Sequence, residues 1–298
     1  MQQTSGVLQL IVAGLTVGSG YALVALGLHI ILRATRVMNF AQGEFTVIGG
    51  LIALTLMQTF HATSVVALIG ATLCGFVLGV VFERFVLRPA ARSGELGVTI
   101  ATVGTVFVLL YGHALVPGWG SLQQPLPPFT GSLSDAITVG GATVQIQSLW
   151  IFALLLVALA ALYVFFERTY YGKAIRAAAN NPLGARLIGI DVTSARAISV
   201  GLAIALAAYG GTIIGPITLV GGAGGVAIAI KGFVGAIIGG LDSPVGCVVG
   251  GLLVGVVEKL LQSSIGASSA DPAVYALLLL MLLLRPQGLF GTRGALRD

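Results

Sequence analysis

The chain has 298 residues, of which 57% are hydrophobic and only 8% charged, against about 25% charged in an average soluble domain. The mean hydropathy is +1.03, which excludes an ordinary water-soluble globular protein. A net charge of +5 would suggest a nucleic-acid partner in a soluble chain. Here the basic residues fall in short connections between apolar segments, so they indicate membrane topology and no nucleic-acid partner.

Long apolar segments recur along the whole chain. A helix rises about 1.5 Å per residue and therefore needs about 20 residues to cross a hydrocarbon core of about 30 Å. The segments are continuously apolar rather than alternating, which favours helices over a β-barrel. The predicted fold class is all-α, a polytopic transmembrane bundle forming one domain over residues 1–298. The nine predicted spans are 7–32, 39–59, 63–85, 97–117, 148–166, 195–219, 226–241, 244–263 and 272–285.

The basic residues predict the orientation of this bundle. Nine crossings put the two termini on opposite sides, and nearly all Arg and Lys residues fall in alternate connections, whereas the loop 118–147 has none. The positive-inside rule then places the N-terminus outside and the C-terminus in the cytoplasm. Residues 1–6 carry no basic signal-peptide region, so the first apolar segment is expected to be a retained span. The proline-rich loop 118–147 is expected to be irregular and extracytoplasmic, either a tether or a face toward a solute-delivery protein.

Glycine is abundant, with 43 residues, and many lie inside the predicted spans at small-xxx-small spacing. Such spacing lets helix backbones approach closely in lipid, so helix packing is the expected role. The seventh span is short and follows the glycine-rich stretch 221–225, and the second opens with polar residues. Two interrupted helices suggest an inverted repeat of spans 1–3 and 6–8. The glycine pairs are Gly14 and Gly18, Gly75 and Gly79, Gly235 and Gly239, Gly246 and Gly250, and Gly251 and Gly255.

The sequence shows no catalytic constellation. His29, His61 and His113 stand apart without metal-ligand spacing, and Cys74 and Cys247 fall inside spans without a disulfide or zinc pattern. The sequence has no GxxxxGK[ST] phosphate loop, so any ATP must be handled by another subunit. We therefore expect no enzyme, no metal site and no cofactor in this chain.

Ionisable residues inside spans are costly and are functional candidates. Glu44 and Lys231 stand out, whereas the neighbours Glu258 and Lys259 are expected to reach the interface or to pair. No span carries the chain of acidic groups expected of a proton or sodium relay, which weighs against a secondary transporter. The candidate residues for a substrate pathway are Asn39, Gln42, Glu44, Tyr209 and Lys231.

The cytoplasmic stretch 167–196 predicts two short helices, 173–179 and 183–188, separated by a stop signal. Its basic character combined with Ile175, Leu187 and Ile188 favours docking into a groove on a soluble partner. The alternative is a solvated loop that serves only topology.

Three segments carry a family resemblance: Gly14 to Glu44, GKAIRAAANNPLGARLIGID at 172–191, and LLRPQGLFG at 283–291. Together they resemble the LivH-type permeases of branched-chain amino-acid ABC importers. The resemblance implies a location in the bacterial inner membrane, a heterodimer with a sister permease, two cytoplasmic ATPase subunits that bind ATP and Mg, and an extracytoplasmic substrate-binding protein. The segment 172–191 resembles the ATPase-contacting loop, although Arg176 stands where the EAA motif of other importers has glutamate. The coupling candidates are Gly172, Lys173, Arg176, Asn180, Asn181, Gly184, Arg186, Gly189 and Asp191.

Two other interpretations of the sequence stay open. An autonomous channel or secondary carrier for urea or another small polar solute would need no ATPase. A purely structural membrane subunit fits the glycine packing but leaves the stretch 167–196 unexplained. The solute itself is open, since the resemblance implies branched-chain amino acids first but also allows urea, amides, other amino acids and aromatic acids.

Overall fold

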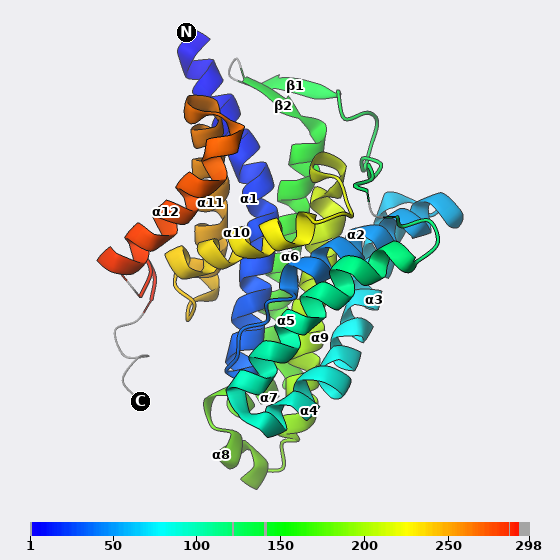
Figure 1. Ribbon diagram of the computed structural model, residues 1–298, viewed down its shortest axis with the longest axis vertical. Coiled ribbons are helices and arrows are strands. Elements are labelled where there is room, and N and C mark those ends of the chain that lie inside the picture. The colour runs from blue at the N-terminus through cyan, green and yellow to red at the C-terminus, as the bar shows by residue number, and fades with distance from the viewer. Residues whose placement is uncertain (1, 121, 140–141, 286, 292–298) are drawn as a thin grey trace.

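The computed structural model describes residues 2–120, 122–139, 142–285 and 287–291, and it is a helical membrane bundle as predicted (Figure 1). Each of the nine predicted spans coincides with a helix. The helices are α1 (Gln2–Thr35), α2 (Gln42–Thr59), α3 (Ser64–Phe82), α4 (Arg88–Ala90), α5 (Gly94–Gly112), α6 (Ile146–Arg168), α7 (Tyr170–Asn180), α8 (Pro182–Leu187), α9 (Val192–Thr218), α10 (Gly224–Gly239), α11 (Pro244–Ile265) and α12 (Ala267–Leu284), with a π-helical turn at Glu83–Leu87 and 3-10 turns at Ala91–Ser93 and His113–Leu115.

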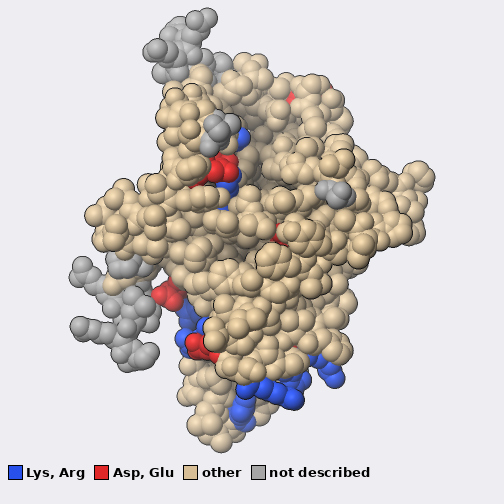
Figure 2. All heavy atoms as spheres, viewed as in Figure 1, with Lys and Arg blue, Asp and Glu red and all other residues tan. Residues whose placement is uncertain are grey.

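The two ends of the bundle differ in character. The start of α1 lies at one end beside two strands, β1 (Ala136–Val139) and β2 (Ala142–Gln145), and we call this the hairpin end (Figure 1). Helices α4, α7 and α8 lie at the opposite end, where Lys and Arg side chains gather (Figure 2). We call this second end the basic end.

The long helices pack in two matching sets. α1 packs along α11, and α9 packs along α3. The short helix α10 runs across α1 rather than along it, and α2 crosses α9 in the same way (Figure 1). α1 and α9 run in opposite senses between the two ends. This packing agrees with the predicted inverted repeat of α1–α3 and α9–α11.

Glycine residues form the closest backbone contacts in both sets, as the small-xxx-small spacing predicts. A Cβ atom on Gly79 of α3 would lie 2.7 Å from the Cα atom of Gly201 in α9. A Cβ atom on Gly18 of α1 would lie 2.9 Å from the Cα atom of Leu252 in α11. Since lipid supplies no hydrophobic drive for helix association, close packing of this kind holds the helices together.

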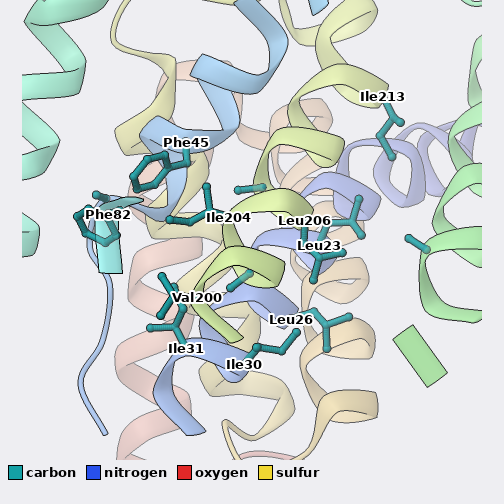
Figure 3. Close-up of a cluster of buried hydrophobic side chains, with 14 of the residues drawn as sticks. Leu23, Leu26, Ile30, Ile31, Phe45, Phe82, Val200, Ile204, Leu206 and Ile213 are labelled. Atoms are coloured by element: carbon teal, nitrogen blue, oxygen red, sulfur yellow. The ribbon is translucent and has the colours of Figure 1, made fainter. Parts of the chain in front are cut away.

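The centre of the bundle is an apolar cluster between α1 and α9. Leu23 and Ile31 of α1 face Val200 and Ile204 of α9, and all four are almost fully buried (Figure 3). The rings of Phe45 in α2 and Phe82 in α3 meet edge to face beside this cluster, with centroids 5.2 Å apart. The cluster fixes α2 and α3 relative to the central helix pair.

The short helices depart from simple crossings. Five described helical stretches are long and apolar enough to span a membrane, at residues 6–35, 64–115, 146–168, 192–218 and 244–265. α10 has 16 residues, fewer than the about 20 that a crossing needs, and α2 has 18 and starts at Gln42 rather than at 39. The count of nine crossings therefore stays a prediction.

The loop 118–147 is more ordered than predicted. β1 and β2 pair antiparallel with Ile137 opposite Val144, a pairing that β-branched residues favour. The amides and carbonyls of Gln124 and Val220 exchange hydrogen bonds of 2.7 and 2.8 Å just before α10. The indole of Trp119 donates to the hydroxyl of Thr55 near the end of α2. The expectation of an irregular segment was wrong for β1 and β2, whereas residues 122–135 form no named helix or strand. The contacts of Gln124 and Trp119 tie the loop to both short helices.

The glycine contacts predict a position-specific loss of stability. In Gly79→Ala the new methyl group meets the backbone of α9, and such overpacking costs about 1–3 kcal/mol. We expect a lower midpoint in thermal unfolding of the purified protein in detergent. Gly104→Ala in α5 is the matched control, because no atom lies within 4 Å of its new methyl group. A midpoint for Gly79→Ala equal to that of the control would contradict the packing described.

Candidate functional site

Two of the predicted pathway residues tie the start of α2 to α9. Asn39 and Gln42 are almost fully buried. The Asn39 side-chain amide donates to Oε1 of Gln42 at 3.3 Å, and Nε2 of Gln42 donates to the carbonyl of Ala203 in α9 at 2.8 Å. These bonds satisfy polar groups where the chain between α1 and α2 is not helical.

Glu44 lies where the N-termini of α2 and α10 meet. Its residue is 2% exposed, and its Oε1 atom has no hydrogen-bond partner. A Cβ atom on Gly225, in the first turn of α10, would lie 2.5 Å from that oxygen. No described Lys or Arg residue forms an ion pair with Glu44. Helix N-termini carry partial positive charge, so the first turns of α2 and α10 offset part of the negative charge of an ionised Glu44.

Lys231, in the middle of α10, holds two carboxylates at once. Its Nζ atom lies 2.8 Å from Oε1 of Glu258 in α11 and 2.8 Å from Oδ1 of Asp271 in α12. The hydroxyl of Tyr21 in α1 donates to Oε2 of Glu258 at 2.8 Å, and Nε2 of Gln262 donates to Oε1 at 3.0 Å. We call Tyr21, Lys231, Glu258 and Asp271 the Lys231 cluster. It links four helices through charge-assisted hydrogen bonds.

The sequence analysis did not find the partners in this cluster. Glu258 was expected to reach the interface or to pair with its neighbour, but it is 4% exposed and pairs with Lys231, whereas Lys259 donates to Gln262. Asp271 lies one residue before the last predicted span, and Tyr21 lies within an apolar run. The sequence did contain a signal for the Lys231–Glu258 pair, because these two residues carry opposite charges and lie in neighbouring predicted spans.

Tyr209, the fifth predicted pathway residue, stands apart from the others. Its hydroxyl donates to the carbonyl of Leu154 in α6 at 2.7 Å. The structure therefore brings Asn39, Gln42 and Glu44 together at the start of α2, places Lys231 in its own cluster, and leaves Tyr209 between α9 and α6. The hydrogen bonds of the described residues do not join these three places.

An apolar groove of about 610 Å³ opens on the other side of α10, toward the basic end. Its walls come from α1, α6, α7 and α11, and its rim carries Arg33, Glu167 and Arg176. α10 packs on α1 at Val24 and Ala25. On α1 this contact lies between Tyr21 of the Lys231 cluster and the residues from Leu26 to Ala34 that line the groove.

The two short helices predicted in the stretch 167–196 are confirmed as α7 and α8. The side chain of Thr169 caps α7, and the side chain of Asn181 caps α8 by accepting from the amide of Gly184 at 2.9 Å. Asp191 caps α9. Hydrogen bonds from Ser194 and Thr193 hold the pKa of the Asp191 carboxyl below its usual range, so this cap stays anionic at neutral pH.

Apolar side chains on α8 and just after it face outward. Leu183, Leu187 and Ile188 are 71%, 82% and 74% exposed. Ile175 is different, since it is buried among Ala178, Ala185 and Ala195, so the expectation that it docks a partner was wrong. Its place on the inward face of α7 explains the burial.

The predicted coupling residues divide by exposure. Gly172 is buried, and a Cβ atom there would lie 2.6 Å from the Cα atom of Phe166, so it packs α7 against α6. Arg176 pairs with Glu167, and both are half-exposed. Gly184 is half-buried against Asn181. The exposed members are Lys173, Arg176, Asn180, Asn181, Arg186, Gly189 and Asp191.

The family described as "Branched-chain amino acid transport system / permease component" matches residues 10–285. The chain belongs to this permease family. It is 30% identical over 295 residues to the high-affinity branched-chain amino acid transport system permease protein BraD of Pseudomonas aeruginosa, covering 95% of each chain. It is 31% identical over 298 residues to the permease protein LivH of Salmonella typhimurium, again covering 95% of each.

Two further comparisons extend the similarity. The probable branched-chain amino acid transport permease protein LivH of Methanocaldococcus jannaschii is 31% identical over 284 residues, covering 90% of this chain and 88% of that one. The solved structure of PsaBC from Streptococcus pneumoniae in complex with Fab matches with a TM-score of 0.51 at 13% identity, covering 92% and 91%. This last likeness shows that the two chains share their overall helical fold.

The Lys231 cluster predicts a stability effect at Tyr21. Tyr21→Phe removes the hydroxyl that donates to the Glu258 carboxylate, and a hydrogen bond to a charged group contributes about 1.5–3 kcal/mol. We expect a lower thermal unfolding midpoint in detergent. Tyr111→Phe in α5 makes the same chemical change at a residue that is 69% exposed, and we expect no shift there. Equal midpoints for the two variants would show that the Tyr21 bond contributes nothing.

Proposed function

We propose that this chain is the membrane-spanning permease subunit of an ATP-driven importer for branched-chain or related amino acids. The observation that carries the proposal is the α7–α8 element at the basic end. Its capped helices present Leu183, Leu187 and Ile188 to the outside, a surface suited to a groove on a soluble partner. Membership of the permease family and the names of its relatives support the solute class.

The proposed assembly contains a sister permease, two cytoplasmic ATPase subunits and an extracytoplasmic binding protein that delivers the solute. ATP and Mg bind to the ATPase subunits in this proposal. The gathering of Arg and Lys at the basic end supports a cytoplasmic location for that end in a bacterial inner membrane (Figure 2). The N-terminus then lies outside and the C-terminus in the cytoplasm.

The packing of α7 in the bundle suggests how ATPase closure is coupled to the helices around the groove. α7 packs on α6 at Gly172, and its residues Ile175, Arg176 and Ala179 form part of the groove wall. Closure of the ATPase pair displaces α7 and α8, and this displacement changes the wall that α7 shares with α1, α6 and α11. The ATPases must contact α8 differently in their two states, because equal contacts would shift no equilibrium.

The pathway is proposed to pass the polar groups of the two short helices. Asn39, Gln42 and Glu44 lie at the start of α2, and Lys231 lies on α10. Tyr209 is the weakest member of this set, because its hydroxyl is already bonded to α6. The five residues remain proposals for the pathway.

Arg186→Glu tests the coupling element. Reversing a charge at a docking surface costs several kcal/mol, so we expect uptake into proteoliposomes by the assembled complex to fall at least about tenfold. We also expect less ATPase to copurify with the permease. Arg92→Glu reverses a charge at the same end, in the turn before α5, and should leave both measurements unchanged. Transport by the chain alone, without ATPase subunits, would instead indicate a channel or secondary carrier.

A further inference from the structure

The Lys231 cluster contains one more negative charge than positive. One ammonium faces two carboxylates, and Tyr21 completes the cluster as a neutral donor. Removing either partner of a buried ion pair is costly because it leaves an uncompensated charge. Because Lys231 has two carboxylate partners, Glu258 and Asp271, it can release one of them and stay paired with the other.

The two carboxylates are not equivalent. Glu258 is 4% exposed and is fixed by bonds from Tyr21 and Gln262 in addition to Lys231. The side chain of Asp271 is 42% exposed, and Lys231 is its ion-pair partner among the described residues. The Lys231–Glu258 pair is therefore the fixed part of the cluster, and the Lys231–Asp271 pair is the part that solvent and solutes reach.

The surroundings of the cluster are apolar. Val234 and Ile238 of α10, Val254 of α11 and Val274 of α12 pack in one group with Tyr21. Acidic and basic side chains lie side by side in a hollow on the hairpin-end half of the face in Figure 2. A solute that suits this setting combines charged groups of both signs with an aliphatic part.

We propose that the Lys231–Asp271 bridge is an exchange site for the zwitterionic end of an aliphatic α-amino acid. The ammonium of the solute replaces Lys231 on Asp271, and its carboxylate is accepted by Lys231, which keeps Glu258. The solute brings no net charge, no proton moves, and every ion has a partner before and after the exchange.

This chemistry selects the class of solute and rests on the proposed function. A neutral solute such as urea has no charged group to offer either Lys231 or Asp271, so it cannot replace the ion pair between them. A monocarboxylate satisfies Lys231 but leaves Asp271 without a cation. The cluster thus favours amino acids over neutral amides and monocarboxylic acids.

Asp271→Asn is the primary test, because it removes the exchangeable carboxylate and leaves the Lys231–Glu258 pair intact. The complex is reconstituted in proteoliposomes with saturating leucine-loaded binding protein. We expect leucine uptake at least about tenfold below wild type, since one hydrogen bond to a charged group is lost at the step that engages the solute. ATPase copurification should be unchanged. Lys259→Met, which removes an ammonium that donates to neutral Gln262, is the control and should transport normally.

A second variant separates solute binding from structural support. Lys231→Met, Glu258→Gln and Asp271→Asn together remove every charge while keeping the packing. If the cluster only supports the fold, this neutral variant transports leucine; if it exchanges with the solute, uptake is lost although the complex assembles. Wild-type uptake in both Asp271→Asn and the neutral variant would overturn the exchange site alone. A wild-type complex that neither binds ATPases nor transports leucine would overturn the proposed function and the exchange site with it.

Discussion

Close contact between helix backbones through glycine is the constraint on which this bundle depends. Water drives no association inside a bilayer, so helices must gain energy from packing at short range. At the crossing of the two short helices, Gly43 of α2 meets the carbonyl of Gly225 in α10. A side chain at either position would push these helices apart, and the placement of Glu44 and Lys231 would change with them.

The crossing of α10 over α1 also divides one helix face into two environments. The charged cluster at Tyr21 lies on one side of Val24 and Ala25, and the apolar groove lies on the other. Helix α7 forms part of the groove wall. The ATPase contact proposed for α7 and α8 and the charged cluster are therefore separated by α10 itself.

Much of this architecture could be predicted from the sequence because its signals are local. Continuous apolar runs predicted the helices, and glycine spacing predicted the packing contacts. The break between α7 and α8 was predicted by Asn180, Asn181 and Pro182. The pairing of Lys231 with Glu258 and Asp271 was not predictable, because it depends on how α10 lies across α1 and beside α12. The burial of Ile175 was missed for a related reason, since only the fold of α7 onto α9 decides which face points inward. The β1–β2 hairpin was missed although its sequence signal is present, since Gly140 and Gly141 separate two short runs that contain β-branched residues.

The hydrogen bonds of Gln124 to Val220 and of Trp119 to Thr55 connect the loop before the hairpin to both short helices. These bonds attach the loop at two positions, Val220 just before α10 and Thr55 near the C-terminal end of α2. The same loop continues covalently from α5 into α6, so a displacement of the loop acts on these two long helices as well as on both short ones. Both halves of the repeat are therefore connected at the hairpin end by one segment of chain.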